Sequence, residues 1–236
     1  MLAPTVGHYQ FVRDDGQPLD FQPGQFIQVH FDYADGTATK RSYSLATIHD
    51  HALGPGDAVD IAVSFVPGGA ATALFEGLET GQCITASGPF GRFCLQPGDH
   101  NGRYLLIATG TGVTPYRSML PLLARAMAGR GVEVVLLQGA RTPAELLYAD
   151  DFRAFADAHP GFRYMPCLSR GLPADPHPDV RSGYVQQQLA EIAPDPARDI
   201  AYLCGNPVMV DACFEVLRAA GLALPQLRRE KYVSSK

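Results

Sequence analysis

A glycine-rich segment lies between an apolar run and a helix start, and its residue types suit phosphate chemistry. Gly110-Thr111-Gly112-Val113-Thr114-Pro115 directly follows the apolar run that ends at Thr109. Glycines let the backbone approach a ligand closely, and the free amides at the start of a helix favour phosphate. The segment is typical of a cradle for a nucleotide pyrophosphate. Because Pro115 replaces the third glycine of the usual GxGxxG pattern, a turn whose glycines serve packing alone is the alternative.

A second motif, Arg41-Ser42-Tyr43-Ser44, combines a cation, a phenol ring and two hydroxyls. In a strand, Arg41 and Tyr43 lie on one face, and Ser42 and Ser44 lie on the other. A guanidinium can hold a phosphate while a phenol ring packs against a flat heterocycle. The motif suits a phosphorylated aromatic ligand, and an ordinary surface strand is the alternative.

The third motif, Leu203-Cys204-Gly205-Asn206-Pro207, ends an apolar strand in a thiol and continues through a glycine turn into a helix that begins with proline. Ligands bind beyond the carboxyl ends of the strands in open α/β sheets, so this thiol is a candidate site residue. The alternative is a small, buried hydrophobic residue, which is the usual role of a single cysteine.

The elements that must position these motifs divide the chain into two halves. Before residue 98, short β-branched and aromatic runs bounded by Gly, Pro or Asp predict an antiparallel barrel or sandwich, with strands at 8–12, 25–31, 41–46, 59–66 and 83–87. From Tyr104 onward, apolar strands alternate with amphipathic helices, which predicts a parallel sheet with strands at 104–109, 132–138, 162–167 and 200–204.

Two helix starts stand out in the second half. Thr142-Pro143-Ala144-Glu145 fits a capping box and predicts a helix to about Ala158. Thr114-Pro115 predicts another in the same way, with a kink at Pro121. The stretch Gly171 to Pro178 holds three prolines and is expected to be an exposed loop.

Composition limits the function classes. Hydrophobic residues are 46% and charged residues 18% of the 236, and no apolar run approaches the roughly 18 residues of a membrane span. The net charge of −5 does not favour nucleic acid or anionic lipid. The five cysteines form no CxxC pair, so the spacing of zinc and iron–sulfur ligands is missing. Their odd number and the absence of a signal-peptide pattern favour a reducing, cytoplasmic setting.

In the order in which they occur along the chain, at 41–44, 110–115 and 203–207, the three motifs resemble those of the ferredoxin:NADP reductase superfamily of two-domain flavoprotein reductases. Three further segments strengthen the resemblance, namely 21–25 (FQPGQ), 66–72 (VPGGAAT) and 88–93 (GPFGRF). The resemblance implies a six-stranded or truncated Greek-key FAD-binding β-barrel over 1–98, then an NAD(P)-binding α/β domain with a five-stranded parallel sheet over 99–236. Members usually have a strand before the position of Leu2, so we expect the barrel to be one strand short.

The resemblance also implies roles for individual residues. Arg41 contacts the flavin phosphate, Tyr43 packs on the isoalloxazine and Ser44 bonds near flavin N5, while Cys204 lies near the nicotinamide C4. Thr111, Gly112 and Thr114 receive the dinucleotide pyrophosphate. Ser169 and Arg170, assisted by Arg141, resemble the group that reads the 2′-phosphate of NADPH. Glu230 matches a catalytic position in the tail, and the other residues expected near the cofactors are Ser42, Val66, Gly69, Ala71, Thr72, Gly205 and Tyr232.

These roles predict an enzyme that uses bound FAD, rather than FMN, to move electrons between NADPH and a separate ferredoxin or flavodoxin, with NADH as the other possible coenzyme. The enzyme is expected to act as a monomer and to bind no metal, nucleic acid or membrane. An acidic carrier would meet basic side chains, for which the candidates are Arg13, Lys40, Arg92, Arg228, Arg229 and Lys231. The alternatives are a reductase that releases reduced free flavin, a reductase component that supplies an oxygenase, and an electron-transfer subunit of a larger complex.

Overall fold

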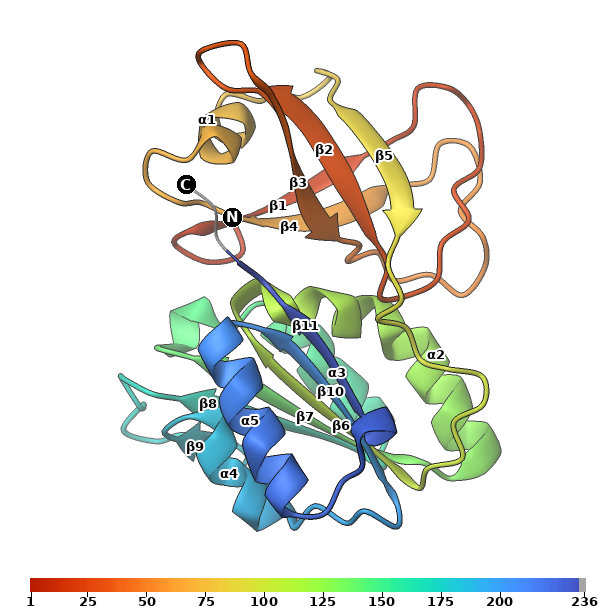
Figure 1. The fold of residues 1–236 in the computed structure, drawn as a ribbon, viewed down its shortest axis with the longest axis vertical. Helices are drawn as coiled ribbons and strands as arrows, with labels where there is room; N and C mark the ends of the chain where they lie inside the picture. The colour runs from red at the N-terminus through yellow and green to blue at the C-terminus, as the bar shows by residue number, and fades with distance from the viewer. Residues whose placement is uncertain (234–236) are drawn as a thin grey trace. The chain divides into compact units, whose positions relative to one another are not determined.

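The computed structural model describes residues 1–233, which form two compact units. The first unit comprises Met1–Cys94 and Thr114–Met119, and the second comprises Leu95–Val113 and Leu120–Val233. Figure 1 labels the helices and strands of each unit.

The first unit is built from two antiparallel sheets. One pairs β1 (Val6–Phe11) with β4 (Val59–Ser64), and the other has the order β3 (Ala38–Ser44), β2 (Phe26–Asp32), β5 (Thr85–Phe90). Alternate side chains of β2 face inward, as period-two patterning predicts, and α1 (Ala70–Glu76) adds Phe75 to the core. The buried core consists of Leu19, Phe21, Ile27, Val29, Leu45, Leu53, Val59, Ile61, Val63 and Phe75. The predicted antiparallel fold is confirmed, with five strands among the described residues and none before β1.

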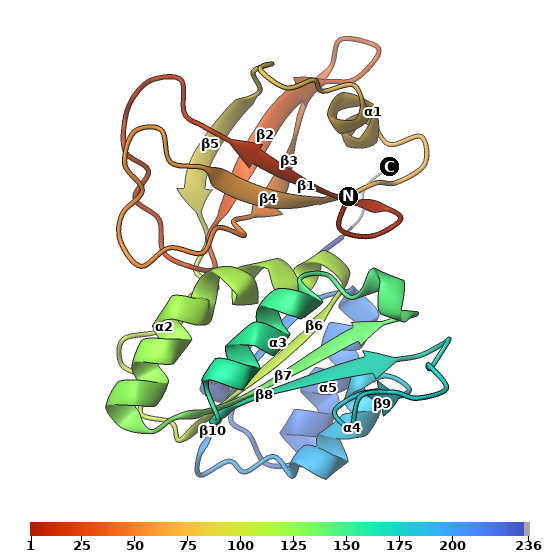
Figure 2. The ribbon, with the colours of Figure 1, turned by 180° about the vertical axis from the view of Figure 1, so that it is seen from behind.

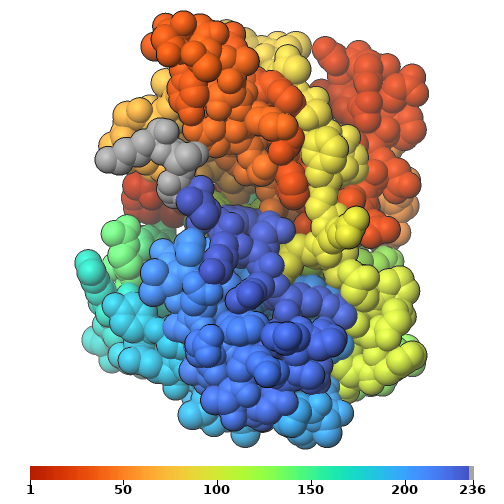
Figure 3. Space-filling view, in the orientation of Figure 1, coloured from red at the N-terminus to blue at the C-terminus, as the bar shows by residue number. Residues whose placement is uncertain are grey.

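The second unit is a parallel sheet with helices on both faces. Its strands are β6 (Arg103–Thr109), β7 (Glu133–Ala140), β8 (Phe162–Leu168), β9 (Arg181–Ser182), β10 (Asp199–Gly205) and β11 (Leu227–Lys231), in the order β11-β10-β6-β7-β8-β9. Figures 1 and 2 show α4 (Val185–Ile192) and α5 (Pro207–Ala219) on one face, and α2 (Thr114–Arg130) and α3 (Ala149–Ala158) on the other. Figure 3 shows α5 and β11, in blue, together on one surface of this unit. The predicted α/β fold is confirmed.

The predicted count of five parallel strands is wrong, because β9 and β11 bring the total in the described chain to six. β9 has two residues, too few for any periodicity to appear. β11 reads Leu-Arg-Arg-Glu-Lys, a charged run without a strand signature, and it becomes an edge strand by pairing with β10.

The predicted helix start at Thr142 is wrong, and the one at Thr114 is right but lacks the predicted cap. After Thr142 the chain makes a short 3-10 turn, η2 (Pro143–Glu145), and α3 begins at Ala149, after Tyr148 adopts a left-handed φ of 56°. Glu145 bonds the backbone and guanidinium of Arg141 instead of closing a capping box. A 3-10 turn, η1 (Gly110–Val113), precedes α2, so Thr114 is its first residue and makes no capping bond. Pro121 lies inside α2, and the kink at that residue stays a prediction. As expected, Gly171 to Pro178 form a largely exposed loop without regular structure.

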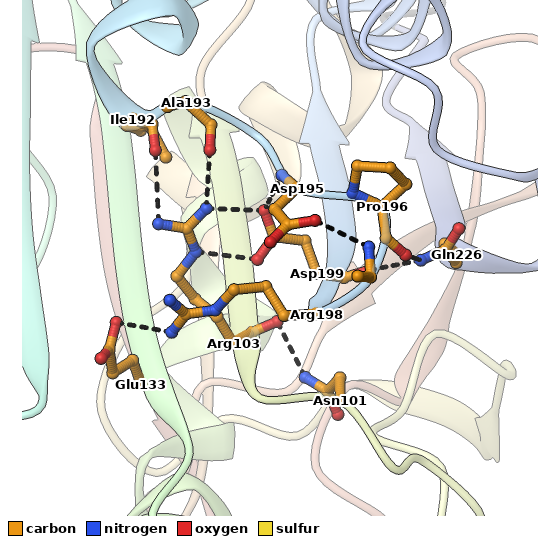
Figure 4. A network of polar contacts seen from close by, with 11 residues as sticks. Asn101, Arg103, Glu133, Ile192, Ala193, Asp195, Pro196, Arg198, Asp199 and Gln226 are labelled. Carbon is orange, nitrogen blue, oxygen red and sulfur yellow. Dashed lines mark hydrogen bonds and ion pairs between the residues drawn. The ribbon is translucent and has the colours of Figure 1, made fainter.

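A buried ion pair joins the amino ends of the adjacent strands β6 and β10 (Figure 4). Arg103, at the start of β6, donates to both carboxylate oxygens of Asp199 at 2.8 and 2.7 Å, and Asp199 is fully buried. The same guanidinium donates to the carbonyls of Ile192 and Ala193, the last residue and the C-cap of α4. One cation therefore joins β6, β10 and the end of a helix.

A second buried carboxylate, Asp99, lies before β6 and bonds Arg228 of β11 through both guanidinium nitrogens. The Tyr104 hydroxyl donates to Asp99 at 3.0 Å, and the Arg228 guanidinium lies 5.0 Å from the centroid of the Tyr202 ring. Burial by itself would raise the pKa of Asp99, but the bonds from Arg228 and Tyr104 outweigh it and hold that pKa below its ordinary value. The pair attaches the edge strand to the segment that leads into the sheet.

We expect Asp99→Asn to lower the free energy of unfolding at pH 7 by about 3 kcal/mol, because Arg228 loses its charged partner. A carboxyl with a lowered pKa stabilises the fold above its unfolded pKa of about 3.9, and this contribution is lost as the pH falls through the folded pKa. The variant should therefore lose less stability than the parent between pH 7 and pH 3 in urea titrations.

The matched control is Asp150→Asn, because the Asp150 side chain is fully exposed in its pair with Arg153 and should matter by less than about 1 kcal/mol. If Asp99→Asn behaves like the control at both pH values, the Asp99–Arg228 pair does not stabilise the fold.

Candidate functional site

The carboxyl ends of the parallel strands gather most of the predicted site residues of the second unit. The chain runs outward from β6 to β7, β8 and β9, and then returns to the other side of β6 with β10 and β11. The sheet therefore has a topological switch point between β6 and β10, where α/β sheets bind ligands. The residues at this edge are Thr111 and Gly112 after β6, Arg141 after β7, Ser169 and Arg170 after β8, Cys204 and Gly205 on β10, and Glu230 and Tyr232 at the end of β11.

Two glycines let the ends of β6 and β10 approach each other. A Cβ on Gly112 would lie 2.3 Å from the Cys204 carbonyl oxygen, and a Cβ on Gly205 would lie 2.5 Å from the Thr109 carbonyl oxygen. Gly205 also has a φ of 125°, which side chains rarely adopt. The Thr109 hydroxyl accepts a bond from the Asn206 amide at 3.1 Å, so each strand end holds the turn that follows the other.

Cys204 is fully buried between Glu230 and Tyr232. Cys204 is paired with Glu230 in the register of β10 and β11, and the Tyr232 amide donates to the Gly205 carbonyl at 2.8 Å. Burial raises the pKa of the Cys204 thiol well above its ordinary value, and the Glu230 charge adds to the rise while a hydrogen bond with Tyr232 opposes it. Burial also raises the pKa of Glu230. The sulfur is therefore a neutral thiol, and the carboxyl beside it is biased toward its protonated form.

Thr114 follows η1 with its side chain buried. It is 1% exposed, and its hydroxyl has no hydrogen-bond partner among residues 1–233. A buried hydroxyl without a partner retains its full capacity to bond an oxygen-rich ligand. This observation fits the predicted phosphate role of the segment that contains Thr111 and Gly112.

The ends of β7 and β8 bring three further predicted residues together. The Ser169 amide donates to the Ala140 carbonyl at 3.0 Å, and the Arg170 amide donates to the Arg141 carbonyl at 2.8 Å. The exposed Arg141 side chain pairs with Glu145 at 2.8 Å, whereas Arg170 is exposed and makes no ion pair within the described chain. One compensated and one uncompensated guanidinium therefore lie on adjacent strand ends.

In the first unit, β3 carries the predicted motif from Arg41 to Ser44. Tyr43 lies opposite Ile27 and packs against Phe75 of α1 with ring centroids 5.3 Å apart, and burial raises its pKa to about 12. Ser42 is exposed and Ser44 is buried. Arg41 lies opposite Val29 on the same face as Tyr43, as strand geometry predicts.

The glycine-rich segment before α1 is closed by the hydroxyl of Thr72. This hydroxyl accepts from the Val66 amide at 2.8 Å and donates to the Val66 carbonyl at 2.9 Å. Gly69, the N-cap of α1, donates its amide to the same carbonyl, and Ala71 lies in the first turn. The segment is thus a compact loop, and Thr72 fixes its shape.

Sequence reasoning missed two polar residues that support these motifs. Thr109 ends β6, as predicted, and its hydroxyl also holds the turn after β10. Tyr33 follows β2, and its hydroxyl accepts a bond from Arg41 at 2.7 Å. Neither contact has a sequence signal, because the partners lie 97 and 8 residues away without a fixed spacing.

Comparison with known proteins identifies the family to which this chain belongs. Residues 3–94 match the model of the oxidoreductase FAD-binding domain, and residues 106–215 match that of the oxidoreductase NAD-binding domain. Ferredoxin–NADP reductase B of Sorangium cellulosum is 35% identical over 98% of this chain and 93% of its own. The chain belongs to the ferredoxin–NADP reductase superfamily. The expected cofactors of this superfamily member, FAD and NADP(H), agree with the two domains.

Two other relatives are longer than this chain. The reductase subunit of the aromatic O-demethylase of an Amycolatopsis species is 34% identical over 92% of this chain, which spans 62% of the subunit. The crystal structure of the Amycolatopsis cytochrome P450 reductase GcoB superposes with a TM-score of 0.82 at 32% identity, over 98% of this chain and 66% of that one.

Residues 1–233 contain no group of three or more His, Cys, Asp or Glu side chains placed to hold a metal ion. None of the helices in this range has the length and apolar character needed to cross a membrane.

We expect Gly112→Ala to destabilise the protein by about 2 kcal/mol, because the new Cβ would overlap the Cys204 carbonyl between two packed strand ends. Urea unfolding measures the change. Gly129→Ala is the matched control, since it lies in α2 with open space around its Cβ position and should stabilise the fold by about 0.5–1 kcal/mol. Equal effects of the two substitutions would contradict the proposed packing constraint.

Proposed function

We propose that this chain is an FAD-dependent oxidoreductase that moves electrons between NADPH and a separate ferredoxin or flavodoxin. The observation that carries the proposal is the close packing of η1 on Cys204 at the switch point, which only a glycine at position 112 permits. This packing places a backbone turn suited to phosphate beside a buried thiol. The near-complete overlap with a ferredoxin–NADP reductase supports the reaction class.

At the carboxyl ends of β6, β10 and β11, the residues would act by binding and orienting the dinucleotide. The backbone at Thr111 and Gly112 and the hydroxyl of Thr114 would hold the pyrophosphate, because amides and hydroxyls at a helix start favour anions. Cys204 and Gly205 would provide an uncharged surface for the nicotinamide. Glu230 and Tyr232, at the end of the neighbouring strand, would limit access of water to that surface, and burial raises the pKa of the Glu230 carboxyl.

In the first unit, Arg41 and the Val66–Thr72 loop would hold the phosphates of FAD, with Gly69 and Ala71 allowing close approach at the start of α1. Tyr43 and the backbone around Ser42 would position the isoalloxazine, and Ser44 would bond near N5. FAD held by these residues would supply the hydride-accepting and single-electron chemistry, so no protein nucleophile is required.

The wider assignments are also proposals. We place the boundary between an FAD-binding domain and an NAD(P)-binding domain at about residue 98, and we expect a monomer. The five cysteines of the chain are all free thiols, which supports a cytoplasmic location.

The basic side chains expected to contact a carrier differ in whether a carboxylate of this chain pairs with their charge. Arg13 pairs with Asp15, Arg228 with Asp99, and both Arg229 and Lys231 with Asp211. Lys40 and Arg92 make no ion pair within residues 1–233, so they are the candidates we retain for contact with an acidic carrier.

A second function is supported by one observation, the 34% identity with a demethylase reductase subunit. In that case the chain would pass electrons to an oxygenase component. The third candidate is a reductase that releases reduced free flavin.

We expect Arg170→Ala to lower the NADPH to NADH ratio of kcat/KM by about tenfold, because a charged bond to the 2′-phosphate is lost. Arg153→Ala, an exposed arginine of α3, should leave the ratio unchanged. An unchanged ratio in Arg170→Ala removes this residue from coenzyme selection.

The carrier can be tested with Lys40→Glu combined with Arg92→Glu. We expect kcat/KM for a small acidic ferredoxin to fall roughly tenfold, and reduction of an uncharged dye to persist, because the field steers only the charged carrier. Arg125→Glu, which changes an exposed arginine without an ion pair in the described chain, is the control. If free flavin alone is reduced at a useful rate, the flavin reductase alternative replaces the proposal.

A further inference from the structure

The hydrogen-bonding of Arg41 is set by residues outside its motif. Its Nη2 donates to the Tyr33 hydroxyl at 2.7 Å, and its Nη1 donates to the Thr39 hydroxyl and the Lys40 carbonyl, both at 2.9 Å. The guanidinium carbon lies 5.9 Å from the centroid of the Phe31 ring and 5.8 Å from that of the Tyr33 ring. The side chain is therefore held in one orientation before any ligand arrives.

These hydrogen bonds leave the Arg41 guanidinium able to bind an anion. A guanidinium has five N–H donors, and three of them are used here, so two remain. All three acceptors are neutral, and Arg41 has no ion pair with a carboxylate in the described part of the chain. Arg103 and Arg228, by contrast, are compensated by buried aspartates. Two free donors on an uncompensated cation match the needs of one phosphate.

Tyr33 is itself held in place by a tight hairpin. Its amide donates to the Thr37 carbonyl at 2.9 Å, and the Gly36 amide donates to the Tyr33 carbonyl at 2.9 Å. Gly36 adopts a φ of 80°, which suits glycine, and the Thr37 amide bonds the Asp35 carboxylate. The hydroxyl that receives Arg41 is thus part of a defined turn rather than a free side chain.

We propose that Tyr33 is a positioning residue that orients Arg41 for a phosphate of the flavin nucleotide. The inference rests on the proposed role of Arg41 in FAD binding and adds a residue that the motif does not contain. Without the phenol hydroxyl, Nη2 would lose its partner while Nη1 kept its bonds to Thr39 and Lys40, so the ligand would have to order that part of the guanidinium and binding would weaken by the cost of doing so.

The test compares flavins with and without phosphate. Protein freed of its flavin is titrated with FAD and with riboflavin, and binding is followed by flavin fluorescence. We expect Tyr33→Phe to raise the Kd for FAD about tenfold, the effect of losing one hydrogen bond to a charged group, and to leave the Kd for riboflavin unchanged. Tyr33→Phe combined with Arg41→Lys should bind FAD no more weakly than Arg41→Lys alone.

Tyr9→Phe is the matched control, because the Tyr9 hydroxyl also bonds within this unit, to the Phe75 carbonyl at 2.7 Å. A merely structural effect would shift FAD and riboflavin by the same factor, and that result for Tyr33→Phe overturns the inference, as does an unchanged Kd for FAD. If Arg41→Lys weakens FAD selectively while Tyr33→Phe does not, the inference fails and the proposed function stands. If Arg41→Lys leaves FAD binding unchanged, the proposed role of Arg41 is what fails.

Discussion

The contact on which the second unit depends is the approach of Gly112 to the carbonyl of Cys204. At this distance no side chain fits between the ends of β6 and β10, and the same holds for Gly205 against Thr109. The backbone of η1 therefore packs closely against the ends of β6 and β10. These are the adjacent strands after which the chain continues to opposite sides of the sheet. Because β10 lies beside β6, its partner β11 brings Glu230 and Tyr232 to the same edge, while β7 and β8 bring the basic residues from the other side.

The motifs were readable from the sequence because each depends on local chemistry. Glycines between a strand and a helix predicted the turn at Gly112, and strand alternation predicted that Arg41 and Tyr43 share a face. What the sequence could not provide were contacts between distant or unpatterned residues. β11 is a strand because it pairs with β10 and because Arg228 finds Asp99, 129 residues away, and neither fact leaves a periodicity. The helix α3 begins at Ala149, later in the chain than predicted, because Tyr148 adopts a left-handed conformation. Tyrosine rarely adopts this conformation, so the sequence does not predict it.

Charge is distributed along the parallel sheet according to two different needs. Arg103 with Asp199 lies at the amino ends of β6 and β10, and Asp99 with Arg228 lies close to the start of β6, in pairs that are largely buried and fully bonded. These pairs join β6 to β10 and β11 to the segment before β6. At the carboxyl ends, Arg170 is left without an ion pair in the described chain, and Thr114 keeps a free hydroxyl. The charges of Arg103 and Arg228 are therefore paired near the amino ends of the strands, whereas polar groups among residues 1–233 remain without partners at the carboxyl ends, where a ligand would bind.

Complete burial gives the Cys204 sulfur an unusual chemical character for a residue in a redox protein. A thiol reacts with oxidants and electrophiles through its thiolate, and this thiol has a pKa well above its ordinary value with no exposed surface. It is consequently shielded from sulfenic acid formation and from alkylating reagents in the folded protein. Cys83, the exposed cysteine, lies in the other unit and would react first. The fold thus places a soft, polarisable atom at the proposed nicotinamide site while making it inert as a nucleophile.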